Sequence, residues 1–329
     1  MIFRQARSIL RCLFALTTVL VLAAGCGKAG GGDENRIAGH QFRLSGTQRD
    51  AVFTVGSEDF TEQEVLGSIA IQVLEAADAT VIDRTGLGGN EAVREALESG
   101  EIDLYWEYTA TGWLVDLSET RSIQDPQMLY EAVAHQDLEE NGIRWLEPAP
   151  GNDTYAIATS KKTRQKLGVE TISDLGRLIE EHPREATLCF SNDDDFRTRF
   201  DGLPGMERAY NFEFPEENLI EVSLDAVYGA VDEAEICNIG VVFTTSGYIR
   251  ALDLQLLEDN KQFFAVYNPA PTLRQETFRQ YPQIRRLFAP VSGKLDTRTL
   301  KELNYAVEVE GKSPDEVANS WLRHNGFIE

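Results

Sequence analysis

Residues that could do covalent chemistry are few and scattered in this sequence. It has no HExxH pair, no GxSxG turn and no paired CxxC, the spacings typical of zinc hydrolases, serine hydrolases and cysteine-bound metals. The histidines stand alone in the sequence: His40, His135, His182 and His324. We therefore predict no catalytic residues and no enzyme activity.

Two short motifs that could hold a phosphate or a metal ion are incomplete. Residues 86–89 (GLGG) lack the spacing and the following Lys of a phosphate-binding loop, so they favour a tight turn between a strand and a helix. Residues 193–195 (DDD) lack the spacing and the Glu of an EF-hand, so they favour a solvated acidic loop. We predict no metal site and no cofactor.

The composition is that of a folded, acidic protein. Of its 329 residues 42% are hydrophobic, and 54 Asp and Glu against 31 Lys and Arg give a net charge of -23. Such a surface repels polyphosphate, so we predict no binding to nucleic acid. The length suggests about two domains.

The N-terminal residues are typical of an export signal. Three arginines precede an apolar run, residues 12–24, that is shorter than the roughly 20 residues a membrane-spanning helix needs. The run ends in LAAGC, which resembles a bacterial lipobox, and an uncleaved anchor is the alternative. We predict a signal peptide over 1–25, lipidation of Cys26 and a flexible, Gly-rich tether over 26–50, so that the membrane is reached only through the lipid.

Two further cysteines remain in the exported part of the chain, Cys189 and Cys237. Each lies in an apolar, strand-like run. Outside the cytosol a disulfide between them is permitted, but two buried free thiols fit the same pattern.

From residue 51 onward strand and helix patterns alternate. Runs at 51–55, 80–83 and 102–106 favour strands, with helices expected from Thr61 and over 90–99. Thr61 and Glu64 have the spacing of a capping box, Asn90 is the expected cap of the second helix, and Gly100 its end. Short loops between such elements predict a parallel sheet.

The alternation returns after Tyr155. Strands are expected at 155–159, 187–190 and 236–243, and helices near 173–181 and 225–235. The C-terminal region favours helices over 276–288 and 298–307, and a third that begins at Ser313 with Pro314 in its first turn. This second set of elements suggests a second α/β lobe.

Several separated blocks of the sequence resemble one known family. They include VGSEDFTEQEVLGSIAIQVLE, GLGGNEAVREALESGEIDLYWEYTATGW, WLEPAPGNDTYA, FRTRFDGLPGMERAY, FTTSGYIRALDLQLLEDNKQFFAVYNPAP and LNYAVEVEGKSPDEVANSWL. They are similar, in the same order, to the substrate-binding proteins of osmoprotectant ABC importers, the glycine betaine/carnitine/choline type. The resemblance runs from about Val52 to Leu322.

This resemblance implies an α/β, bilobed periplasmic-binding-protein fold, type II-like, with a hinge and a ligand cleft between the lobes. Residues 51–154 and 268–329 would form lobe 1, and 155–267 lobe 2. It also implies an exported lipoprotein facing the periplasm or cell exterior, working with an ABC permease and its ATPase. We expect a monomer, because the two lobes must open freely.

The resemblance also implies a site for a quaternary ammonium compound such as glycine betaine, choline or carnitine. A methylated ammonium has a charge but no N–H, so aromatic faces bind it through cation–π contacts of about 0.5–2 kcal/mol each. By position in the family pattern, the residues expected to bind the ligand are Tyr108, Thr111, Asp153, Tyr155, Arg199, Phe243 and Tyr267. Four of them supply the rings, and Arg199 would pair with a ligand carboxylate.

One position departs from the family pattern. Glu58 stands where relatives often carry a Lys that helps to hold a carboxylate, and in the cleft it would favour a cation such as choline. Other aromatic side chains near these positions are assigned to packing: Tyr105, Trp106, Trp113 and Tyr228. A sensory or structural lipoprotein of the same fold and a hydrolytic enzyme are the alternative functions.

Overall fold

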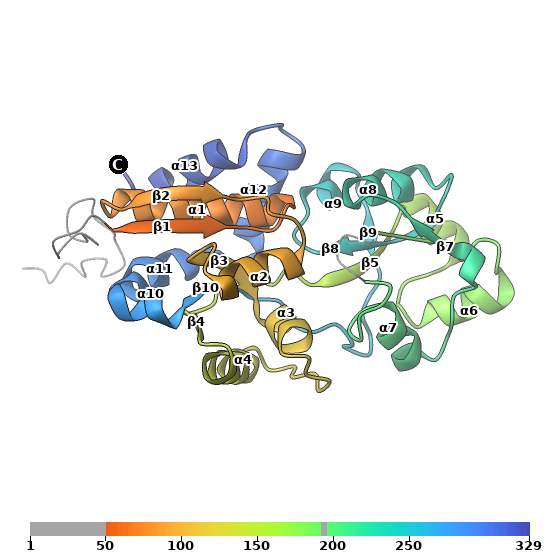
Figure 1. Cartoon of the computed structure of the whole chain (residues 1–329). Helices are drawn as coiled ribbons and strands as arrows, with labels where there is room; N and C mark the ends of the chain where they lie inside the picture. Colours follow the sequence, from red (N-terminus) through yellow and green to blue (C-terminus); the bar gives the residue numbers. More distant parts are fainter. Residues whose placement is uncertain (1–50, 192–195) are drawn as a thin grey trace, which may run out of the picture. The chain divides into compact units, whose positions relative to one another are not determined.

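The computed structural model describes residues 51–191 and 196–329, which form two five-stranded sheets (Figure 1). The predicted signal peptide, the tether and Cys26 lie outside these residues, as does the acidic run at 193–195. Within the described part of the chain, no helix is both long and apolar enough to span a membrane.

The first sheet has the order β2-β1-β3-β10-β4. Its strands are β1 (Val52–Gly56), β2 (Thr80–Arg84), β3 (Leu104–Tyr108), β4 (Ile143–Trp145) and β10 (Pro269–Arg274). β1 runs parallel to β2 and β3, as predicted, but β10 runs antiparallel to β3 and β4. The expectation of a purely parallel sheet is therefore wrong, because β10 enters this sheet from the opposite direction after the chain has built the second one.

The second sheet has the order β7-β6-β8-β5-β9. Its strands are β5 (Tyr155–Thr159), β6 (Leu188–Phe190), β7 (Leu219–Glu221), β8 (Ile239–Phe243) and β9 (Gln255–Leu256). β6 is parallel to β7 and β8, whereas β5 is antiparallel to β8 and β9. The three strands predicted after Tyr155 are thus present in one sheet.

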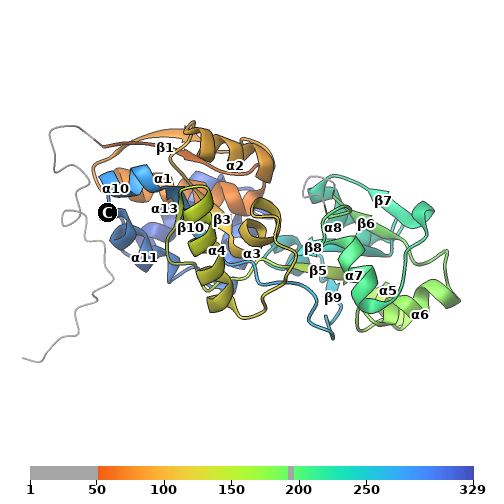
Figure 2. The ribbon, with the colours of Figure 1, turned by 60° about the horizontal axis from the view of Figure 1, so that its bottom comes forward.

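Helices cover both sheets. Those between and after the strands of the first sheet are α1 (Thr61–Ala76), α2 (Asn90–Ser99), α3 (Thr109–Thr111), the π-helical turn η1 (Gly112–Asp116), α4 (Pro126–Glu140), α10 (Gln275–Gln280), α11 (Ile284–Ser292), α12 (Thr297–Glu308) and α13 (Pro314–His324). Those of the second sheet are α5 (Lys161–Leu167), α6 (Asp174–Glu181), α7 (Leu203–Tyr210), the 3-10 turn η2 (Glu216–Asn218), α8 (Leu224–Glu233) and α9 (Gly247–Ala251). α1 and α13 lie side by side in both views (Figures 1 and 2).

The C-terminal helices share a core with the first sheet. Phe53 of β1, Ile69 of α1, Phe288 of α11 and Leu322 of α13 are all fully buried in one apolar cluster. Burying a side chain of this size stabilises the fold by about 1.5–3 kcal/mol. The predicted helix over 276–288 is in fact two, α10 and α11, because Pro282 disfavours the helical conformation at the residue before it.

The helix starts differ in how well the sequence predicted them. Ser313 and Glu316 form the reciprocal capping box of α13. The box predicted at Thr61 is wrong: Phe60 holds the N-cap position in an extended conformation, and the Glu64 amide donates to its carbonyl oxygen. At α2 the cap is Gly89, and the Asn90 amide donates instead to Asp116.

Two connecting segments, 146–154 and 257–268, run between the sheets and are hydrogen-bonded to each other. The Asp153 amide donates to the Tyr267 carbonyl oxygen (3.1 Å), and the Tyr267 amide donates to Asn152 Oδ1 (2.7 Å). Asn268 Nδ2 donates to the Gly151 carbonyl oxygen (2.6 Å). The lobe boundaries given above, at 154/155 and 267/268, stay a prediction.

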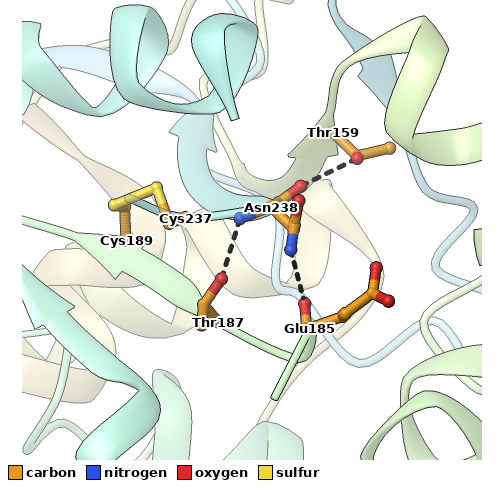
Figure 3. The surroundings of a disulfide bond; sticks show 6 residues. All are labelled: Thr159, Glu185, Thr187, Cys189, Cys237 and Asn238. Atoms are coloured by element: carbon orange, nitrogen blue, oxygen red, sulfur yellow. Dashed lines mark hydrogen bonds between the residues drawn. A yellow bond between two sulfur atoms is a disulfide. The ribbon is translucent and has the colours of Figure 1, made fainter. Parts of the chain in front are cut away.

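A disulfide joins Cys189 of β6 to Cys237, two residues before β8 (Figure 3). Both residues are buried, and 48 positions of sequence separate them. Next to it, Asn238 donates from its amide to Thr187 Oγ1 and from Nδ2 to the Glu185 carbonyl oxygen, and it accepts from Thr159. Of the two alternatives that the sequence leaves open, the structure has the bridge.

Candidate functional site

A cleft of about 1370 Å³ receives side chains from both sheets. All the residues predicted to bind the ligand line it, and so does Glu58. The four predicted rings lie at strand ends: Tyr108 ends β3, Phe243 ends β8, Tyr155 begins β5, and Tyr267 precedes β10 by two residues. The fold therefore brings together positions that are up to 159 residues apart in the sequence.

Tyr155 lies at the centre of the ring cluster. It is the cross-strand partner of Phe243, and their ring centres are 5.2 Å apart. The Tyr267 ring meets it edge-on at 5.6 Å. Both tyrosines are 4% exposed, so their orientation is fixed by packing while they line the cleft.

Phe60 is a fifth ring that sequence reasoning did not single out. It stacks on Tyr108 at 6.3 Å and on Phe243 at 5.7 Å, and so connects rings of the two sheets. Its one available signal was its place in the block VGSEDFTEQ, directly before α1. Tyr228, assigned to packing from the sequence, also lines the cleft, and its hydroxyl accepts from the Phe243 amide (3.3 Å).

Arg199 is held by Asp201 rather than being free to swing. Its Nε and Nη2 donate to the two carboxylate oxygens of Asp201, at 3.0 and 2.7 Å, and Tyr267 donates its hydroxyl to the same carboxylate. Burial alone would raise the pKa of Asp201, but the Arg199 guanidinium holds that pKa below its usual value. The guanidinium carbon lies 5.7 Å from the centre of the Tyr155 ring, which places this fixed cation beside the ring cluster.

A buried polar network lies beside Tyr108. The Tyr108 hydroxyl donates to Glu62 (3.0 Å), and Asn304 Nδ2 donates to the other oxygen of Glu62 (2.8 Å). The Thr245 hydroxyl donates to Asp153 Oδ1 (2.5 Å). Burial raises the pKa of both Glu62 and Asp153, and for Asp153 the charge of Glu62 adds to the effect.

Acidic side chains dominate the lining of the cleft: Glu58, Asp59, Glu62, Glu64, Glu91, Glu95, Glu98, Asp116, Asp153, Asp225 and Glu308. The basic residues among the described lining are Arg94 and Arg199. Arg94, like Arg199, is already paired: it donates to both oxygens of the buried Asp137, and to Asp116 at 3.3 Å. The cleft therefore has a strongly negative field, which attracts cations.

Glu308 connects α12 to the start of α9. Its carboxylate accepts from Ser246 Oγ (3.0 Å) and from the Gly247 amide (2.6 Å). Burial raises its pKa to about 7. Glu62, Asn304 and Glu308 were all missed by sequence reasoning, because nothing local distinguishes them from other polar residues on amphipathic helices.

Comparison with known proteins supports this picture of a ligand-binding cleft. Residues 52–324 match OpuAC, described as the substrate binding domain of ABC-type glycine betaine transport system. The glycine betaine-binding protein YehZ of Escherichia coli (strain K12) is 34% identical over 280 residues, which cover 84% of this chain and 91% of that protein. The ergothioneine transport permease/ergothioneine binding protein EgtU of Helicobacter pylori (strain G27) is 32% identical over 274 residues, which cover 83% of this chain and 47% of that protein.

The fold comparison agrees with the sequence comparison. The solved structure of apo YehZ from Escherichia coli matches with a TM-score of 0.63 and 33% identity, covering 84% of this chain and 99% of that one. The resemblance noted in the sequence and the bilobed fold that it implied are thus confirmed. The chain belongs to the OpuAC family, the substrate-binding domains of ABC-type glycine betaine transport systems.

Proposed function

We propose that this protein captures a quaternary ammonium compound between the rings of Tyr108, Tyr155, Phe243 and Tyr267 and delivers it to an ABC permease and its ATPase. The observation that carries the proposal is the meeting of these rings, from both sheets, in one acidic cleft. A methylated ammonium cannot be held by hydrogen bonds from its own nitrogen, whereas each ring face contributes about 0.5–2 kcal/mol.

The same arrangement explains how binding would favour a closed cleft. Tyr108 belongs to the first sheet, while Tyr155 and Phe243 belong to the second. A cation that contacts rings on both sides binds the closed arrangement better than the open one and shifts the population toward it. Residues 51–154 with 268–329 and residues 155–267 would be the two lobes, and Arg199 and Thr111 would contact the polar end of the ligand.

The test is a pair of Phe243 variants. Phe243→Leu keeps an apolar side chain but removes the ring, and we expect it to weaken binding of choline, glycine betaine or carnitine by about 2- to 30-fold. Phe243→Tyr keeps the ring and should retain the affinity. Calorimetric titration of the purified protein measures both, and equal affinities for the two variants would contradict the ring cage.

Substrate-binding proteins of ABC importers work outside the cytoplasm, and we propose that this one is held at the membrane by a lipid on Cys26, as a monomer. The support is the LAAGC sequence at 22–26 and the Gly-rich stretch that follows. Metabolic labelling with radioactive palmitate should mark the wild-type chain and leave Cys26→Ser unlabelled. Labelling of the Ser variant would contradict this anchor.

A further inference from the structure

Asn304 of α12 has an amide whose orientation the structure fixes. Its Nδ2 donates to Glu62 Oε2 (2.8 Å) and to the Thr245 carbonyl oxygen (3.1 Å), both of which can only accept. Turning the amide over would place its oxygen against two acceptors, so the nitrogen must face them. Asn304 Oδ1 therefore points elsewhere, and among the described residues no donor reaches it.

This unsatisfied acceptor belongs to the wall of the cleft. Asn304 is 2% exposed and lines the cleft together with Glu62 and Asp153, which are also buried. A buried acceptor without a donor costs about 1–3 kcal/mol. The site is therefore stabilised when a donor enters it.

The neighbouring donors are already in use. Tyr108 and Thr245 have one hydroxyl hydrogen each, and these hydrogens go to Glu62 and Asp153. Both hydrogens of Asn304 Nδ2 are taken as well. No Lys, Arg or His of the described chain forms an ion pair with Glu62 or Asp153, so this wall has acceptors and negative charge but no spare donor.

We propose that Glu62, Asp153 and Asn304 form a subsite for a hydrogen-bond donor of the ligand. The ligand is then a quaternary ammonium compound that also carries an O–H or N–H group, such as an amino alcohol or a hydroxylated or heterocyclic betaine. Glycine betaine, whose one polar group besides the nitrogen is a carboxylate, leaves the subsite empty. This inference rests on the proposed function and narrows its ligand class.

The distribution of charge in the cleft agrees with this assignment. A ligand cation near Glu62 and Asp153 stabilises their ionised forms, which burial otherwise disfavours. A carboxylate at the same wall would be repelled, and its place is beside Arg199. The relatives show that the named ligand varies at about one-third identity: YehZ is named for glycine betaine, and EgtU for ergothioneine, a betaine whose ring carries an N–H.

Matched ligand pairs test the subsite directly. Choline and n-propyltrimethylammonium differ in a hydroxyl against a methyl group, and carnitine and γ-butyrobetaine differ in one hydroxyl. We expect the hydroxylated member of at least one pair to bind the wild-type protein about fivefold more tightly or better, measured by calorimetry. A smaller preference in both pairs overturns the subsite but leaves the ring cage standing. Failure of all four compounds to bind overturns both proposals.

Variants then place the preference on Asn304. In Asn304→Ala we expect the preference within that pair to fall to about twofold or less, as the acceptor is gone. Asn319→Ala, which removes an amide that donates to Gln72 on α13, away from the cleft, should keep it. A preference that survives in Asn304→Ala overturns the assignment, and if that variant fails to fold, the wild-type ligand pairs still decide.

Discussion

Glu308 should make the stability of this protein fall as the pH rises from acid to neutral. Its pKa is raised from an ordinary 4.5 to about 7, mainly by burial. Below pH 4.5 the carboxyl is protonated in both the folded and the unfolded chain, so it has no effect there. Above pH 7 it is ionised in both, and the folded state bears the whole cost of the buried charge.

The magnitude follows from the difference between the two pKa values, since one pKa unit corresponds to 1.36 kcal/mol. An ionised Glu308 therefore lowers the free energy of unfolding by about 3 kcal/mol at pH 8. Glu308→Gln resembles the protonated side chain and still has an oxygen to accept from Ser246 and Gly247. We expect the variant to exceed the wild type by about 3 kcal/mol at pH 8 and to match it at pH 4.

Urea unfolding followed by tryptophan fluorescence at pH 4, 6 and 8 measures these differences. The matched control is Glu302→Gln on the same helix, where the side chain is 64% exposed and the variant should match the wild type at every pH. A Glu308→Gln difference that is the same at pH 4 and pH 8 would refute the reasoning.

Four further outcomes are expected. Asp137→Ala leaves the buried guanidinium of α2 without its partner, so the free energy of unfolding should drop by about 3–5 kcal/mol; a loss below about 1 kcal/mol contradicts this. Replacing Cys189 and Cys237 together by Ala should cost about 4 kcal/mol and lower the Tm, and an unchanged Tm would be the opposing result. Tyr108→Ala should lose at least about 1–2 kcal/mol of ligand affinity while Tyr108→Phe keeps most of it; equal, small effects would indicate simple packing. Glu58→Lys should strengthen glycine betaine binding, and no change would rule out an electrostatic role for Glu58.

The sequence predicted the elements whose patterns are local. Alternating strand and helix signals located β1, α1, β5 and α8 to within a few residues, and the capping box located the start of α13. β10 was not expected, because it contains Pro269 and Pro271, which cannot donate to a strand ladder. It takes a central place nonetheless: the carbonyl oxygens of both prolines accept from Leu146 and Ala149. That pairing depends on residues more than a hundred positions away and leaves no trace in the local sequence.

The site was predictable only in part. A single tyrosine in the sequence looks the same whether it packs in a core or lines a cleft, so Tyr108, Tyr155 and Tyr267 were identified through the family resemblance. Phe60 and Asn304 were missed because their roles arise from side chains that meet only in the folded chain. The orientation of the Asn304 amide, in particular, depends on acceptors from α1 and from the loop after β8.

The two hydrogen-bonded segments between the sheets give the protein a mechanical economy. Tyr155 follows one segment directly, and Tyr267 lies within the other. Because Asp153 and Tyr267 are joined backbone to backbone, the paired segments would twist as one ribbon rather than as two loose strings. Any such twist would reorient the very rings that face the cleft, so the pivot and the grip would share the same few residues.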